Sequence, residues 1–420
     1  MHNWWARYSA TCNHVLVFLI VFTLPINLFY QIDTEGAYLR GLLVDYLIRK
    51  IYLHQVLLLV LAALNWRSLL RQLITWARAW RQLLRRPTVW VAVVLVGGLL
   101  WRQLNSPLPA VGVSQWLSLG AGGALVYWLA RRPPPQTNRY RRTITRAALT
   151  AIAVQSALAY AQFTLQRSLF PYWLLGESNL HNLAHISRGQ FFDIELILPY
   201  ASAAHPNILA GCMTLLSLIV WQQLRGRATW QRSLLLGNLL LILGLTQSLS
   251  AAAALLAYAL WRSRLPRWLL AALAAIIVIA TPLGLTQLSQ NSTHPSLQRR
   301  VSLNQAAWQM WQAQPLWGVG LQQFTTQLEI YAPRQEIVRF VQPVHHVPLL
   351  ILSEGGLWLM ITLIYLGYLT RHQLATSALF VPIVIFNLDH YLLTQSGMWL
   401  LLLLFLLLAR SRTNRDRQRG

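Results

Sequence analysis

Two adjacent histidines, His345 and His346, open the apolar segment HHVPLLILSEGGL (345–357) and are the strongest candidates for chemistry in the sequence. The segment predicts a helix whose free N-terminal N–H groups and positive dipole end lie beside both imidazoles. That position disfavours imidazolium, keeps a histidine neutral and available as a general base, and attracts phosphate. The alternative is that the pair only caps and anchors the helix, and the spacing alone does not separate the two interpretations.

Arginines accompany these histidines in two segments, 164–199 and 287–346, that are longer than a connection requires. Arginine supplies fixed positive charge and suits bidentate binding of phosphate. Carboxylates are scarce there, so the residues predict an anionic substrate and disfavour Mg²⁺ or Ca²⁺, which need oxygen ligands. The arginines concerned are Arg188, Arg299, Arg300, Arg334 and Arg339.

Four further ionisable residues lie in or beside apolar segments. Glu354 is expected two helical turns below the histidine pair, either as a functional group or as a carboxylate hydrogen-bonded between helices. Asp389 and His390 end another apolar segment, where Asp389 is able to orient a histidine or merely to close the helix end. His205 precedes a helix-starting proline and lies either in a cavity or in the packing.

The sequence predicts no metal and no cofactor. HNLAH (181–185) has the i, i+4 histidine spacing that can hold Zn²⁺, but it lacks the glutamate of a metalloprotease and has no evident third ligand. No P-loop, dinucleotide-binding fingerprint or nucleophile elbow is present, which leaves a nucleotide-driven reaction without support.

Composition indicates that these residues are positioned by membrane-spanning helices. The chain has 420 residues, of which 55% are hydrophobic and only 11% charged, a balance unlike that of a soluble domain. Apolar runs predict an all-α polytopic fold of twelve spans, near 14–32, 51–66, 88–103, 108–130, 144–163, 200–223, 233–246, 249–262, 267–286, 347–369, 374–390 and 396–410. The short pair within 233–262 could instead form one long helix.

The positive charge follows this topology. Of 35 basic residues, 24 fall in alternate segments, which predicts a cytoplasmic side bearing both termini. The net charge of +24 therefore mainly reflects the orientation of the chain in the membrane, and the basic residues on the cytoplasmic side contact membrane lipids. Binding of nucleic acid is not needed to explain this charge. The long segments then lie on the outer, periplasmic side.

The chain is expected to form a single membrane domain over 1–420. Within the second long segment, 299–314 predicts an amphipathic helix at the membrane surface, with Val301, Trp308 and Trp311 on one face, followed by a turn at 317–320 and a helix near 321–330. The parts are N-terminal spans (1–163), a first periplasmic loop (164–199), central spans (200–286), a large periplasmic loop (287–346), C-terminal spans (347–410) and a basic tail (411–420).

These segments resemble the O-antigen ligase/O-antigen polymerase superfamily of bacterial membrane glycosyltransferases. The stretches that carry the resemblance are RRVSLNQAAWQMWQAQPLWGVGLQQF (299–324), HHVPLLILSEGGL (345–357), AHPNILAG (204–211) and DHYLLTQSGMWL (389–400). It covers most of the chain from about 160 onward, whereas residues 1–150 match only as hydrophobic spans.

The resemblance implies a GT-C-like, metal-independent, inverting transfer on the periplasmic face of the bacterial inner membrane. The donor it implies is a glycan on undecaprenyl diphosphate, and the acceptor is a sugar hydroxyl, that of lipid A–core in ligases. It implies His345 or His346 as the base, and Arg188 with Arg299 or Arg300 at the diphosphate. Polymerase-like members often have His-Asn at 345–346, so the pair here favours ligase slightly. Protein O-oligosaccharyltransferase and a lipid-linked sugar flippase are the alternatives.

Overall fold

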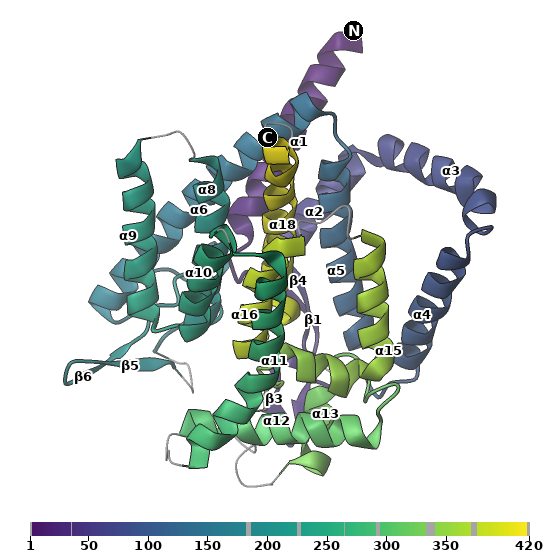
Figure 1. Cartoon of the computed structure of the whole chain (residues 1–420). Helices are drawn as coiled ribbons and strands as arrows, with labels where there is room; N and C mark the ends of the chain where they lie inside the picture. Colours follow the sequence, from purple (N-terminus) through teal and green to yellow (C-terminus); the bar gives the residue numbers. More distant parts are fainter. Residues whose placement is uncertain are drawn as a thin grey trace.

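A computed structural model describes residues 2–34, 36–181, 186–224, 228–263, 265–290, 295–332, 341–370 and 376–417. The long helices run side by side, and the short elements gather at one end of them (Figure 1). Both ends of the described chain lie at the opposite end (Figure 1).

The helices carry apolar runs of the length that the sequence pattern predicts. In chain order they are α1 His2–Thr23, α2 Leu53–Leu64, α3 Trp66–Leu83, α4 Pro87–Leu104, α5 Pro109–Ala130, α6 Pro134–Leu165, α7 Tyr172–Leu175, α8 Pro206–Gln223, α9 Thr229–Thr246, α10 Leu249–Arg262, α11 Arg267–Gln290, α12 Pro295–Ala313, α13 Phe324–Tyr331, α15 Val347–Thr370, α16 Phe380–Leu388, α17 Tyr391–Thr394 and α18 Ser396–Arg417. Two 3₁₀ turns are η1 Asp45–Leu47 and η2 Thr376–Leu379.

Three small antiparallel hairpins complete the described chain. They pair β1 Phe29–Asp33 with β4 Arg49–Tyr52, β2 Tyr38–Leu39 with β3 Leu42–Leu43, and β5 Arg188–Phe191 with β6 Ile194–Ile197. The first two lie between α1 and α2 in sequence and form one N-terminal flap, defined here as residues 29–52. Fourteen of the eighteen residues of α8 are buried, and a helix that is buried all round belongs to the core.

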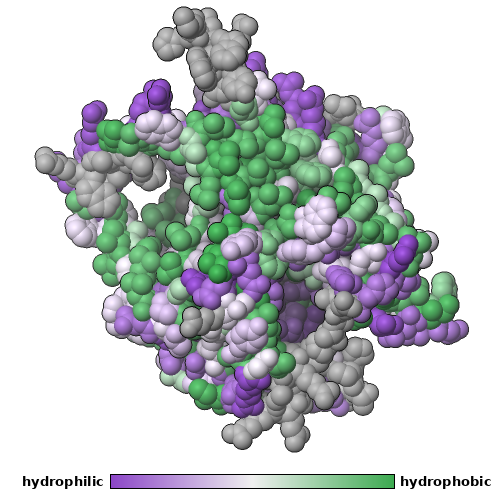
Figure 2. All heavy atoms as spheres, turned by 180° about the vertical axis from the view of Figure 1, so that it is seen from behind, coloured by the Kyte–Doolittle hydropathy of each residue, from purple (hydrophilic) through white to green (hydrophobic). Residues whose placement is uncertain are grey.

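Each of the twelve predicted spans contains a helix, and the described chain is largely helical, which agrees with the expected all-α membrane fold. Within the described residues, four helices are long and apolar enough to cross a membrane: α4, α6, α11 and α15. A fifth candidate joins α2 to the start of α3 across a bend of 74°. Figure 2 shows a broad apolar zone across one face of the molecule. Twelve crossings and a GT-C architecture remain predictions.

Several boundaries differ from the sequence-based expectation. The span predicted at 14–32 ends at Thr23, ahead of Pro25, and its last residues form β1. The span predicted at 200–223 begins only at Pro206. The arginine-rich segment from Arg67 onward, which lies between two predicted spans, forms helix α3. The segment 233–262 is two helices, separated at Gln247, whose φ of 49° ends α9.

The expected helix at 299–314 is confirmed as α12, and the one near 321–330 as α13; both lie across the lower end of the bundle (Figure 1). Helix α12 packs on the protein through residues other than the tryptophans. Leu303 and Met310 are fully buried, whereas 46% of Trp308 is exposed. The Trp308 ring lies beside that of Trp311, with ring centroids 4.7 Å apart and the two ring planes tilted by 57°.

Candidate active site

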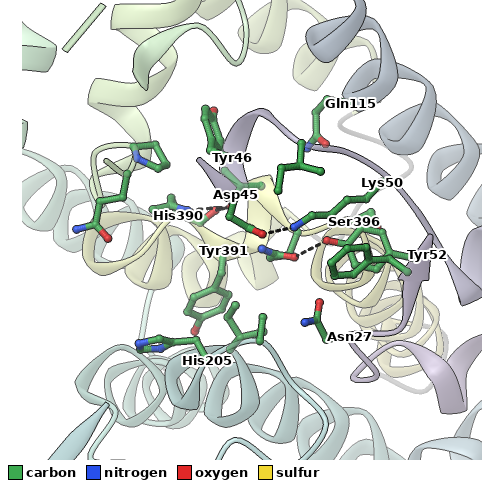
Figure 3. A pocket seen from close by; sticks show the side chains of 18 of the residues that line it. Asn27, Asp45, Tyr46, Lys50, Tyr52, Gln115, His205, His390, Tyr391 and Ser396 are labelled. Carbon is green, nitrogen blue, oxygen red and sulfur yellow. Dashed lines mark hydrogen bonds and ion pairs between the residues drawn. The ribbon is translucent and has the colours of Figure 1, made fainter. Parts of the chain in front are cut away.

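A cavity of about 510 Å³ lies at the end of the bundle that carries the hairpins. Its walls come from segments that are distant in sequence: the N-terminal flap, α5, the start of α8, the approach to α15 and the region of α17 (Figure 3). Four of the candidate residues line it: His205, His345, Asp389 and His390. Amide and aromatic side chains fill much of the remaining wall, among them Asn27, Tyr52, Gln55, Gln115, Tyr172, Asn207 and Gln395.

His345 and Asp389 form the centre of the polar group. His345 Nδ1 lies 3.4 Å from Asp389 Oδ1, and Asp389 is 4% exposed. The backbone N–H of His390 donates to Asp389 Oδ1 at 2.9 Å, and the Asn207 side chain donates to Oδ2 at 3.3 Å. These contacts fix the carboxylate, which in turn orients the His345 ring with Nδ1 toward Asp389.

His390 stands beside His345, with ring centroids 5.1 Å apart. Its Nδ1 lies 2.9 Å from Thr394 Oγ1. Potential ligand atoms of His345, Asp389 and His390 all lie within 4.8 Å of one another, so these three side chains could together hold a metal ion. In HNLAH, whose histidine spacing was considered for Zn²⁺ and not favoured, His181 is exposed and His185 lies outside the described residues.

His346 points away from the cavity and caps α15. Its Nδ1 accepts from the Leu349 N–H at 3.2 Å, and its Nε2 lies 3.1 Å from the Val278 carbonyl. The ring therefore carries its proton on Nε2, which donates to Val278. Burial lowers the pKa of His346, although the hydrogen bond to Val278 opposes this shift. Both ring nitrogens are occupied, which suits a structural role.

His205 is also held at both nitrogens. It is the N-cap of α8, where Nδ1 accepts from the Asn207 N–H at 3.1 Å, and its Nε2 lies 2.9 Å from Ser187 Oγ. His205 thus lines the cavity and also packs into the start of α8. The same turn carries Asn207 to Asp389, so AHPNILAG positions the carboxylate.

The three arginines differ in their placement. Arg300 donates to the Leu388 carbonyl at 3.2 Å, directly before Asp389, and its charge acts on Asp389, His390 and His205. Arg299 lies next to it on α12, and burial lowers its pKa. Arg188 lies on β5, largely exposed, where it pairs with Glu195 at 3.8 Å. His294, Arg334 and Arg339 lie outside the described residues.

Glu354 does not line the cavity; it joins α15 to the loop before it. Its carboxylate accepts from the Phe324 N–H at 3.0 Å and from Tyr46 Oη at 3.2 Å. Helix α15 is broken next to it, at Gly356, which has φ 61° and ψ −163°. Of the two interpretations of Glu354, the geometry agrees with that of a carboxylate hydrogen-bonded between helices and loops, and not with that of a functional group.

The break in α15 is filled by the turn 315–320. Val319 and Gly320 donate their N–H groups to the carbonyls of Ser353 and Glu354, both at 2.8 Å. In return the Leu357 N–H donates to the Pro315 carbonyl at 2.9 Å. Backbone groups freed by the break are thus satisfied by the turn, as a helix buried in a membrane requires.

Sequence reasoning missed the wall formed by the N-terminal flap. Asp45 and Lys50 form an ion pair there, reaching toward each other across the pocket (Figure 3). The Lys50 side chain is only 7% exposed, and its Nζ lies 4.4 Å from the centroid of the Phe29 ring. The charges of this segment were visible in the sequence, but no motif linked them to residues 300 positions later.

Comparison with known proteins bears on the same elements. Residues 232–364, from α9 into α15, match a family model described as O-antigen ligase. This part of the chain is similar to the O-antigen ligase/polymerase superfamily. No curated protein matches the sequence.

The O-antigen ligase match confirms the resemblance inferred from the sequence, over a shorter range than the one expected from residue 160 onward. It contains Arg299, Arg300, His345 and Glu354. Asp389, His390 and His205 lie beyond it, as does the N-terminal flap. The match supports a glycosyltransferase-like function of the ligase or polymerase type, with a lipid-linked glycan and a glycan acceptor as general partners.

Proposed function

We propose that the protein is an O-antigen ligase-type glycosyltransferase of the bacterial inner membrane. It moves a glycan from undecaprenyl diphosphate to a sugar hydroxyl of lipid A–core on the periplasmic face, with inversion and without a metal. The observation that carries the proposal is the His345–Asp389 pair on the wall of a polar cavity, in a chain whose residues 232–364 match the O-antigen ligase family.

His345 is the proposed base. Its Nδ1 faces Asp389, which leaves Nε2 to take the proton of the acceptor hydroxyl. The hydroxyl oxygen attacks the anomeric carbon as the bond from that carbon to the diphosphate oxygen breaks, and the diphosphate leaves with the electron pair. Asp389 stabilises the imidazolium that results, as a buried carboxylate does for a catalytic histidine.

Negative charge develops on the diphosphate during this step and needs a cation near the cavity. Arg300 is the best placed of the three predicted arginines, because its charge acts on the residues of the His345–Asp389 group. Arg188 is expected to contribute less, since it is paired with Glu195 on an exposed hairpin. Arg299 is expected to contribute less than Arg300, because only the charge of Arg300 acts on Asp389 and His390. The amide-rich and aromatic wall suits the hydroxyl groups and ring faces of sugars.

The test uses purified protein in nanodiscs with glycosylated undecaprenyl diphosphate and lipid A–core. His345→Ala is expected to lower kcat by about 10²–10⁴-fold at unchanged protein abundance. His346→Ala is expected to lower the folded yield but to leave kcat per folded molecule much closer to wild type. Normal transfer by His345→Ala would reject the assignment.

A gene deletion separates ligase from the alternatives. Loss of all capped glycan with intact lipid-linked polymer indicates a ligase, and caps of a single repeat indicate a polymerase. Movement of labelled lipid across reconstituted vesicles without a new glycosidic bond would instead indicate a flippase.

A further inference from the structure

A second hollow lies between α2 and α5. Its lining is mostly apolar, whereas many polar side chains line the active-site cavity. It has a volume of about 400 Å³, and aliphatic side chains line most of it, including Leu58, Leu59, Leu117, Ala121 and Leu125. Leu59 and Leu117 are 67% and 70% exposed, so the hollow is an open groove along the side of the bundle.

The groove and the cavity meet. Four residues line both: Lys50, Gln55, Ser114 and Ser118. At this junction Gln55 of α2 donates to Ser118 Oγ of α5 at 2.8 Å, which bridges the two helices at the point where the lining changes from apolar to polar. An amphiphile lying across the junction would therefore have its chain in the groove and its head in the cavity.

The size of the groove favours a single chain. Its α5 wall runs from Ser114 to Trp128, which at 1.5 Å per residue is about 20 Å of helix. Such a groove accommodates part of one long isoprenoid chain, whereas lipid A carries several acyl chains side by side.

The charge at the junction is positive and buried. Lys50 carries it, held over the Phe29 ring and paired with Asp45, whose side chain is 69% exposed. Because Asp45 is exposed to solvent, its attraction to Lys50 is screened, and an arriving anion can displace it at small cost. Lys50 is then able to donate to phosphate oxygens.

We propose that the α2–α5 groove holds the polyprenyl chain of the lipid-linked donor and that Lys50 contacts its diphosphate at the junction. The glycan then extends into the cavity toward His345. This assignment rests on the proposed function and adds to it the N-terminal flap, which lies outside the segment matched to the O-antigen ligase family.

Crosslinking tests the groove without relying on transfer. A benzophenone amino acid replaces Leu117 in the full chain in phosphatidylglycerol nanodiscs, with undecaprenyl diphosphate as the probe. Leu256 on α10, 63% exposed and outside the groove, is the matched control position. A polyprenyl adduct at 117 and not at 256 is expected. Equal labelling at both positions, or phospholipid adducts alone, would overturn the proposal.

Chain-length dependence supplies the kinetic test. Ala121→Trp fills the groove, and Ala130→Trp changes an exposed alanine of the same helix outside it. Ala121→Trp is expected to raise KM for the undecaprenyl donor at least about tenfold while leaving a short-chain isoprenoid donor unaffected. Equal loss with both donors, or a rise only in the acceptor KM, would overturn the groove assignment. Absence of transfer by the wild type with either donor would instead contradict the proposed function.

Lys50→Gln tests the headgroup contact. It should raise KM for both donors by about tenfold or more, because a hydrogen bond to a charged group is lost, whereas Arg49→Gln, whose side chain pairs with Asp33, should not. An unchanged donor KM in Lys50→Gln would remove Lys50 from the site.

Discussion

Nδ1 of His345 lies 3.4 Å from Oδ1 of Asp389, a contact between the approach to α15 and the end of α16. The carboxylate is held from two further directions, by the His390 backbone and by Asn207 at the start of α8. Three chain segments therefore determine the direction in which His345 presents its other nitrogen, and this relationship gives the first prediction.

Asp389→Asn should lower kcat by about 10²-fold, at the lower end of what a positioned base contributes, with little change in KM. The amide keeps the size of the side chain but removes the charge that stabilises the imidazolium. Steady-state kinetics over a range of pH measure the effect. Asp193→Asn, an exposed acid in the β5–β6 hairpin, is the control. A proportional rise in KM would point to lost binding instead.

His346 should act on stability. Replacing it by alanine removes the cap of α15 and is expected to cost about 0.5–2 kcal/mol of the free energy of unfolding. Thermal unfolding in detergent measures this. A drop in kcat per folded molecule comparable to that of His345→Ala would contradict the structural assignment.

The same residue predicts a pH dependence. The pKa of His346 is lowered in the folded protein from 6.5, because the ring is buried. As the pH falls below about 6.5, His346 binds a proton in the unfolded chain but stays neutral in the folded protein. The contribution of this residue to stability is therefore lost. His346→Gln should show a smaller fall in melting temperature between pH 7 and pH 5 than the wild type. An identical fall in both would refute this.

Gly318→Ala should destabilise the protein by about 1–3 kcal/mol. Gly318 has φ 62°, and an added Cβ would lie 2.4 Å from the carbonyl carbon of Glu354. Gly367→Ala, in open space on α15, is the matched control and should be neutral or slightly stabilising. Melting temperatures compare the two, and equal values for both variants would argue against the docked turn.

Chelation tests the His345–Asp389–His390 group directly. Because the proposed step uses His345 as a base, dialysis against EDTA should leave the transfer rate unchanged. If the rate falls and Zn²⁺ restores it, the three side chains act as ligands, and the base must be sought elsewhere.

The positions of the helices were largely predictable from the sequence, because a long apolar run predicts a helix buried in the membrane. Their ends were less so: Pro25 and Pro206 moved two boundaries by several residues. The arginine-rich α3 was missed as a helix because its apolar residues lie on one face among arginines rather than in a run.

The site was predictable in its residue types but not in its pairing. His345 and His346 are neighbours with the same local sequence signal, and only the packing against Val278 separates the cap from the cavity residue. No motif linked Lys50 to the site, since its position there depends on the N-terminal flap folding against helices far along the chain. Contacts between distant segments are a property of tertiary structure, and local patterns do not encode them.

The backbone hydrogen bonds between the turn 315–320 and helix α15 also affect how the protein is inserted into the membrane during synthesis. While α15 enters the bilayer alone, the carbonyls of Ser353 and Glu354 and the N–H groups of Leu357 and Trp358 lack their final partners. Each backbone N–H or C=O group without a hydrogen-bond partner raises the free energy of the helix in the hydrocarbon core of the bilayer. The turn precedes α15 in the chain and is therefore synthesised first, ready to dock as the helix emerges from the translocon. Biogenesis thus favours a loop that comes before its helix.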